Sequence, residues 1–152
     1  MSTPVSTPEP EIRSLIGEWT EALRAKDVAR RTAHYDDDVL IFDVINPVQH
    51  LGLDALKQRL IQWFSTFDGP IDSELRDLHI AADDQVAFCH SLQRFRGSLT
   101  NGGMLDMLVR YTTCLRKIDD RWVVTHEHAS TPFDPKTGLA SVATPPSAAE
   151  RS

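Results

Sequence analysis

Four runs rich in β-branched and aromatic residues follow one another in the second half of the chain, with only short turn signals between them. The runs cover residues 71–82, 86–96, 104–118 and 121–130, and the links are Asp83-Asp84, the loop 97–103 and Asp119-Asp120. Four successive strands with short links are most simply an antiparallel meander. The sequence therefore predicts one sheet in which these strands are neighbours.

Helical spacing dominates the first half of the chain. Apolar residues recur at i, i+3, i+4 and i+7, the pattern of an amphipathic helix with one buried face. The predicted helices span residues 11–25, 28–34 and 53–67, the second with Asp27 as its N-cap. An acidic turn, residues 36–38, and a short strand, residues 39–44, lie between the last two helices. Helices before a run of strands indicate an α+β domain with the helices on one face of one sheet.

Size and charge exclude several classes of protein. The chain has 152 residues, 41% of them hydrophobic and 25% charged, which fits a single globular domain. Its formal charge is −6 and its basic residues are scattered, so we expect no binding to nucleic acid or to an anionic membrane. No apolar run approaches the roughly 20 residues of a membrane span. The first ten residues lack the parts of a secretory signal, and we therefore expect a cytoplasmic protein.

The two ends and the two cysteines complete this description. Residues 1–10 and 140–152 carry too little apolar surface to offset chain entropy, and both are predicted to be disordered tails. The predicted domain spans residues 11–139. Cys89 and Cys114 lie in apolar, strand-like contexts, which favours buried free thiols over a disulfide.

Two histidines lie next but one to each other on the last predicted strand. Because side chains alternate along a strand, His126 and His128 are predicted to share a face with Trp122 and Val124, and Glu127 to point the other way. The pair could transfer protons or complete buried hydrogen bonds, and the sequence leaves both interpretations open. A metal would need a third ligand that the spacing does not establish, so no metal or other cofactor is predicted.

A guanidinium on the preceding strand is predicted to lie among apolar neighbours. Asp106 and Arg110 are four residues apart and share the predicted face with Leu108 and Thr112. A buried arginine must pair with a carboxylate of the protein or with an acidic or carbonyl group of a ligand. Both partners remain possible from the sequence.

Asp43 is the acid inside the otherwise apolar run VLIFDV. An acid in such surroundings can act as a proton carrier in a site. The alternative is an exposed aspartate that forms a turn at the end of the strand.

Three stretches together resemble a known group of proteins. They are the early helix with Trp19, the segment DDDVLIFDV followed by Pro47 and Gly52, and the C-terminal stretch MLVRYTTCLRKIDDRWVVTHEHASTPFDP. On these residues the chain resembles the SnoaL-like and ketosteroid-isomerase-like proteins of the NTF2-like superfamily. The resemblance implies a cone in which a curved antiparallel sheet wraps around a pocket covered by the N-terminal helices. It also implies a homodimer, which we expect to form through the sheet face that carries Glu127.

The resemblance also assigns roles to individual residues. In the steroid isomerases an acid after the early strand removes a proton next to a carbonyl, and Asp43 is similar in position. The phenol that holds the oxyanion would fall at Trp19, and the second donor, an acid, near Thr112 or Thr113. Both oxyanion donors therefore differ from the isomerase pattern. Arg110 and the histidine pair could supply a different polar end of the pocket.

The predicted site contains two groups of residues. The candidate catalytic residues are Asp43, Arg110, His126 and His128, and the candidate ligand-binding residues are Trp19, Tyr35, Trp63, Asp106 and Thr112. We expect the pocket to take a small apolar molecule with a carbonyl or acidic group and to catalyse isomerisation, cyclisation or dehydration by proton transfer. The alternative is a ligand-binding or dimeric assembly module of the same fold without chemistry.

Overall fold

A computed structural model describes residues 8–141 of the chain. Its elements follow the predicted order with one unpredicted addition, the short strand β2. Their bounds are α1 (Glu9–Arg24), α2 (Val28–Arg31), β1 (Tyr35–Phe42), β2 (His50–Leu51), α3 (Leu53–Ser65), β3 (Asp72–Ala82), β4 (Val86–Ser98), β5 (Met104–Ile118) and β6 (Arg121–Ser130). Within the described residues, no helix has the length and apolar character needed to span a membrane.

Several boundaries differ from the prediction. Helices α2 and α3 end at Arg31 and Ser65 rather than at residues 34 and 67. Helix α1 begins at Glu9, so the predicted N-terminal tail overlaps its first turn, and Pro10 is accommodated there because the first turn needs no donor from it. Strand β1 begins at Tyr35 and contains the three aspartates predicted as a turn. Apart from residues 8–10, 140 and 141, the predicted tails lie outside the described residues.

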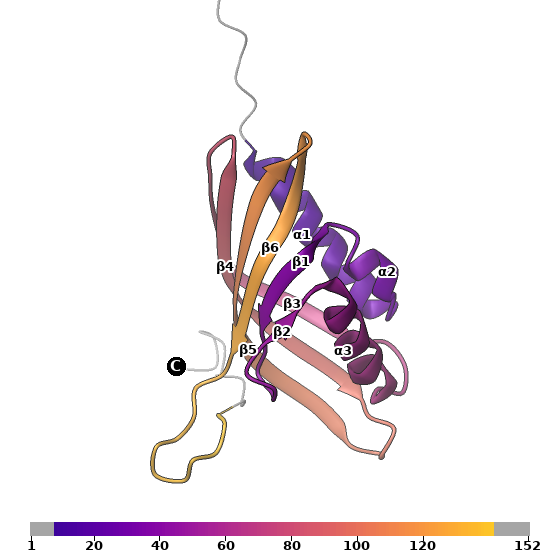
Figure 1. Ribbon diagram of the computed structural model, residues 1–152. Coiled ribbons are helices and arrows are strands. Elements are labelled where there is room, and N and C mark those ends of the chain that lie inside the picture. Colours follow the sequence, from indigo (N-terminus) through magenta and orange to yellow (C-terminus); the bar gives the residue numbers. More distant parts are fainter. Residues whose placement is uncertain (1–7, 142–152) are drawn as a thin grey trace, which may run out of the picture.

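One six-stranded sheet has the order β2-β1-β6-β5-β4-β3 (Figure 1). Strands β3 to β6 form the predicted antiparallel meander. Strand β1 runs parallel to β6, which makes the sheet mixed rather than wholly antiparallel. Helix α3 and strands β3 to β5 lie between these two strands in sequence, so the chain has ample length to return in the same direction.

The helices lie together on one side of the curved sheet, which confirms the predicted α+β architecture (Figure 1). The six buried residues of α1 are those of the predicted apolar face, and they are Ile12, Leu15, Ile16, Trp19, Ala22 and Leu23. They join inward-facing strand residues such as Val109 and Leu115 in one hydrophobic core. We call the covered side of the sheet the inner face and the opposite side the outer face.

A β-bulge in β6 reverses the faces predicted for its later side chains. Leu115 pairs with Val124 and Cys114 pairs with His126, which leaves Thr125 as an extra residue on β6. An extra residue shifts the alternation, so side chains beyond it point to the face opposite to the one that counting predicts. The apolar pattern of this strand gives no sign of the bulge.

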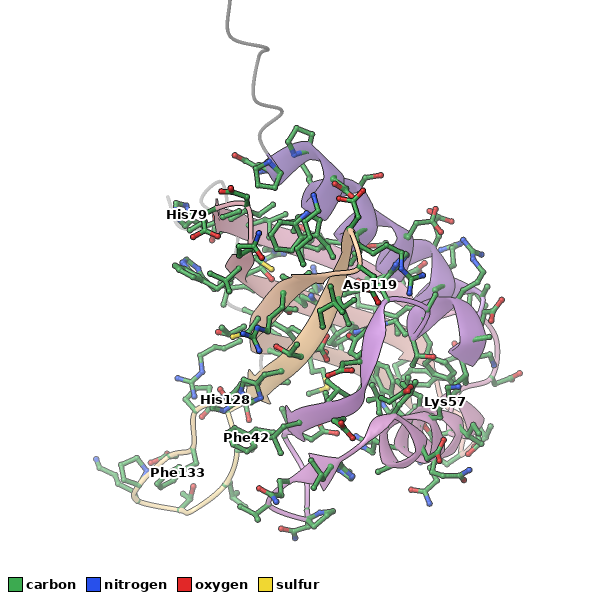
Figure 2. The ribbon with its side chains drawn as sticks, turned by 45° about the horizontal axis from the view of Figure 1, so that its top comes forward. Phe42, Lys57, His79, Asp119, His128 and Phe133 are labelled. Carbon is green, nitrogen blue, oxygen red and sulfur yellow. The ribbon has the colours of Figure 1, made fainter. Side chains whose placement is uncertain are left out.

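Beyond the bulge, Glu127 lies on the inner face and is 2% exposed. His126 and His128 lie on the other side of the strand, and their ring centroids are 4.8 and 5.5 Å from that of Phe42. Figure 2 shows His128 beside Phe42. The predicted inward placement of the two histidines is therefore wrong. The face with Glu127 is also unsuited to the predicted dimer contact, because the helices cover it, and dimerisation itself stays a prediction.

Gly97 marks a close approach between β4 and the segment after α3. A Cβ at this position would lie 2.8 Å from Cδ1 of the buried Phe67 ring and 3.2 Å from the carbonyl oxygen of Pro70. We expect Gly97→Ala to lower the free energy of unfolding by about 1–3 kcal/mol in urea denaturation, because the ring must move within a packed core. Gly17→Ala is the control.

Gly17 lies on the exposed side of α1, and a Cβ there would meet no atom within 4 Å. Its replacement should raise the free energy of unfolding by about 0.5–1 kcal/mol, since alanine loses less conformational freedom in a helix. Equal stability of the two variants would contradict the close packing at Gly97.

Candidate functional site

A cavity of about 90 Å³ lies between the inner face of the sheet and the helices. Its apolar wall includes Leu56, Leu60 and Trp63 of α3 and Met107 and Val109 of β5. Trp63 is one of the predicted ligand-binding residues. The space is smaller than the roughly 150 Å³ that encloses a benzene molecule in a protein core, but the cavity is partly open to solvent. It therefore suits a short chain, or a small ring that projects from its mouth.

Charged side chains interrupt the apolar lining of the cavity in two places. Arg31 and Glu127 border the cavity together with the phenol of Tyr111. Asp43 and Arg59 border it as a second pair of opposite charges. Each place therefore contributes one positive and one negative side chain.

The first place is part of a buried network of four residues, Arg31, Tyr35, Tyr111 and Glu127. Both phenols donate to the carboxylate, Tyr35 to Oε1 and Tyr111 to Oε2, the latter at 2.9 Å. Arg31 donates through Nη1 to the Tyr35 oxygen and through Nη2 to the Tyr111 oxygen at 3.3 Å. Its Nη2 atom also lies 3.7 Å from Oε1 of Glu127. Every carboxylate oxygen is thus matched by a donor, as a buried charge requires.

Short-range features of the chain bring Arg31 to this position. The Asp27 side chain accepts from the amide of Arg30 and caps α2, a helix of four residues that ends at Arg31. The guanidinium then packs over the Trp19 ring, with Cζ 4.5 Å from the ring centroid. Trp19 is 3% exposed and lies beneath Arg31 rather than in the cavity wall. Its predicted ligand contact is thereby replaced by a contact with the arginine.

Burial sets the protonation of the two phenols in the buried network. It raises the pKa of Tyr35 well above 10, against the lowering effect of the Arg31 charge. Burial and then the Glu127 charge raise the pKa of Tyr111 in the same way, and a smaller contribution comes from Asp43. Both phenols therefore keep their protons at neutral pH and remain donors.

Arg31 keeps its charge in spite of burial. Loss of hydration lowers its pKa, but the oxygens of Tyr35, Glu127 and Tyr111 outweigh this and raise it above its usual value. The Nε atom of Arg31 is buried and has no hydrogen-bond partner within residues 8–141. A buried donor without an acceptor is costly, so a ligand oxygen that came within hydrogen-bond distance of Nε would be favourable.

The second place is formed by Asp43 and Arg59, with His50 close by. We call these three residues the Asp43 cluster. Arg59 Nε donates to Oδ2 of Asp43 at 2.8 Å, and the amide of Val44 donates to Oδ1 at 2.7 Å. His50 Nε2 lies 4.0 Å from the same Oδ2 atom. The side chains of Asp43 and Arg59 are each 15% exposed. The carboxylate is therefore held in one orientation beside the cavity.

The remaining predicted residues of β5 lie outside the cavity. Arg110 is exposed, and its Nε donates to Ser130 Oγ at 3.2 Å. Thr112 is exposed as well, and Asp106 accepts two hydrogen bonds from Arg94 at 2.9 and 2.8 Å. The predicted burial of Arg110 is wrong, because this face of β5 has no helix over it.

The two predicted histidines also lie away from the cavity wall. His126 Nδ1 is 2.7 Å from the carbonyl oxygen of Leu40. His128 borders a shallow groove along residues 42–49, and Asp43 borders the same groove. Within the described residues, no group of three or more His, Cys, Asp or Glu side chains is arranged to hold a metal.

The cysteines are free thiols, as predicted. Cys89 is 3% exposed, and burial raises its pKa to about 11. Cys114 is partly buried, and burial raises its pKa as well. Neither thiol is therefore a nucleophile at neutral pH.

Sequence reasoning missed most of the charged groups at the cavity. Glu127 was missed because the bulge places it on the face opposite to the one that strand alternation predicts. Nothing in the local pattern distinguishes Arg31 or Arg59 from surface arginines. Tyr111 could have been found, because Met107, Val109 and Tyr111 follow one another at intervals of two residues and so share the apolar face of β5.

Comparison with known proteins gives a consistent result. The sequence matches the family model of the SnoaL-like domain over residues 12–134. The crystal structure of an NTF2-like protein of unknown function from Pseudomonas putida KT2440 has a TM-score of 0.82 and 32% sequence identity, and the match covers 91% of this chain and 96% of that chain. Among curated proteins, none matches the sequence significantly.

Two more distant structures share the fold. A ketosteroid isomerase-like protein from Erwinia carotovora atroseptica has a TM-score of 0.70 and 18% identity, over 82% of this chain and 96% of that chain. An NTF2-like superfamily protein from Salmonella enterica has a TM-score of 0.74 and 14% identity, over 88% of this chain and 96% of that chain.

Glu127→Gln tests the buried network. The amide cannot balance the Arg31 charge, so we expect the free energy of unfolding to fall by about 3–5 kcal/mol in urea denaturation. Glu74→Gln, at an exposed pair with Arg76, should leave stability nearly unchanged. Similar stability of both variants would mean that Arg31 does not depend on the carboxylate.

Proposed function

The chain belongs to the SnoaL-like domain family, and from this premise we propose that its cavity binds a small carbonyl compound and moves a proton on it. Membership of the family supports a small-molecule-binding domain, whereas a shared fold does not select a reaction. The observation that carries the chemistry is that two polar residues, Arg31 and Asp43, border one apolar cavity, and that the buried Nε of Arg31 has no partner within residues 8–141.

The Arg31 side of the cavity is suited to a carbonyl oxygen. When a proton leaves the carbon next to a carbonyl, negative charge develops on that oxygen. A donor already fixed in a site of low dielectric stabilises this charge more than water does. Arg31 is fixed by Tyr35, Tyr111 and Glu127, so its Nε–H is the donor that we assign to the ligand oxygen.

Asp43 is the group that we assign to the proton. Its carboxylate would take the proton from the carbon and return it to another carbon, which is an isomerisation. Alternatively, it would pass the proton to a hydroxyl group on the neighbouring carbon, which leaves as water in a dehydration. The amide of Val44 and Arg59 hold both of its oxygens, so the base is oriented before the ligand enters.

The balance of charge favours a neutral ligand. Arg31 is balanced by Glu127, and Arg59 by Asp43, so neither place has an excess charge that an anion would neutralise. The volume of about 90 Å³ further favours a single ring or short chain over a steroid. A small ketone meets both conditions.

Exchange of the α-protons of cyclohexanone in deuterium oxide tests the proposed chemistry. We expect the wild type to accelerate the loss of the α-proton signal in NMR spectra, and Asp43→Asn to reduce this rate by about 100-fold or more, because the amide is not a base. Asp106→Asn, a surface carboxylate paired with Arg94, is the matched control and should retain the rate.

The same experiment separates catalysis from binding alone. Cyclohexanone that shifts the resonances of cavity residues without exchanging its protons would favour a non-catalytic binding module. An Asp43→Asn variant with the wild-type exchange rate would contradict the assigned role of this carboxylate.

Ligand charge provides an independent prediction. Cyclohexanone should bind at least about tenfold more tightly than cyclohexanecarboxylate, because the anion finds no unbalanced positive charge in the cavity. NMR titration of the protein with each compound measures both dissociation constants. Tighter binding of the carboxylate would show that the ligand is acidic.

A further inference from the structure

We propose that His50 carries the proton between Asp43 and the solvent, an assignment that rests on the proposed function of Asp43 as the base. His50 Nε2 lies 4.0 Å from Oδ2 of Asp43. This nitrogen is buried and has no hydrogen-bond partner in the described part of the chain. The carboxylate that the proposed reaction protonates thus lies 4.0 Å from a buried nitrogen without a partner in that part of the chain.

Strand pairing brings the ring to this position. His50 begins the two-residue strand β2 and pairs with Ile41 of β1, two residues before Asp43. Its side chain is 13% exposed although Nε2 is buried, so the ring has one side toward Asp43 and still reaches the surface. An imidazole can accept a proton at one nitrogen and release one from the other.

The other contacts of Asp43 cannot accept its proton. The amide of Val44 and the guanidinium of Arg59 are donors without a free lone pair. The adjoining cavity wall, with residues such as Leu60 and Trp63, is apolar. His50 is therefore the contact of Asp43, among those the described residues make, that can take up a proton.

The relay is balanced in three transfers. Asp43 removes a proton from the carbon next to the carbonyl, which leaves a carboxylic acid and an enolate. The carboxylic acid passes its proton to Nε2 of a neutral His50, which restores the carboxylate and forms an imidazolium. The imidazolium releases its Nδ1 proton to water, which leaves the transferred proton on Nε2. When the ring turns toward its exposed side, that proton exchanges with solvent, and the return transfer then supplies a solvent proton to Asp43.

The separation of 4.0 Å is longer than a hydrogen bond by about 1 Å. Distances between catalytic groups are often longer without a ligand and shorten in the complex. A small rotation of the imidazole would bring Nε2 within hydrogen-bond distance of the carboxylate.

Isomerisation of the β,γ-unsaturated form of cyclohexenone in deuterium oxide tests this assignment. In the wild type, exchange through His50 should replace the transferred proton, so the conjugated product should carry deuterium at the new C–H position. In His50→Gln the amide cannot relay a proton, and Asp43 should return the original proton. We expect several-fold more unlabelled product by mass spectrometry, while isomerisation continues.

Two other histidines serve as controls. His128 borders the groove that also reaches Asp43, and His90 is exposed on β4. His128→Gln and His90→Gln should each give the deuterium content of the wild type. His50→Asn is a second variant with a smaller amide and should behave as His50→Gln does.

The outcomes distinguish this inference from the proposed function. A wild type without isomerisation or exchange contradicts both. A wild type that isomerises, with the same deuterium content in both His50 variants, contradicts the relay and leaves the role of Asp43 intact. Loss of label in His128→Gln, with label retained in His50→Gln, would assign the relay to the other histidine and overturn the proposal.

Discussion

The ion pair between Arg31 and Glu127 is the interaction on which the cavity depends. Its two charges are almost completely removed from water, and they persist there because Tyr35 and Tyr111 each accept from the guanidinium and donate to the carboxylate. The four residues of the network come from α2, β1, β5 and β6. The buried network therefore connects α2, the shortest helix in residues 8–141, to three strands, and it gives an apolar cavity one polar wall.

This arrangement also limits what the cavity can bind. Because positive and negative charges are paired within the buried network and within the Asp43 cluster, neither group needs a charged ligand. Two of the buried side-chain nitrogens without a hydrogen-bond partner in residues 8–141 belong to these groups of residues: Nε of Arg31, and Nε2 of His50 beside Asp43. A neutral molecule with one acceptor oxygen and an acidic C–H bond would complement these groups, which is why proton transfer next to a carbonyl is the reaction that we favour over binding alone.

The bulge at Thr125 decides which side chains of β6 belong to the site. Without it, His126 and His128 would face the helices and Glu127 would lie on the outer face. With it, the carboxylate reaches Arg31 and the histidines pack against Phe42. A protein with the same composition and the same strands but a regular β6 would have a different cavity, because one inserted residue exchanges the two faces of everything that follows.

The amino-acid sequence by itself determined the α+β class, the meander of β3 to β6 and the buried face of α1, because each depends on a repeating pattern of neighbouring residues. It also indicated Asp43 and Trp63, both of which border the cavity. Only the tertiary structure decided that Glu127 is internal, that Arg31 rather than Arg110 is the buried guanidinium, and that Trp19 and Tyr35 support Arg31. These facts depend on a bulge and on contacts between segments as far apart as Arg31 and Glu127, and no local periodicity encodes either.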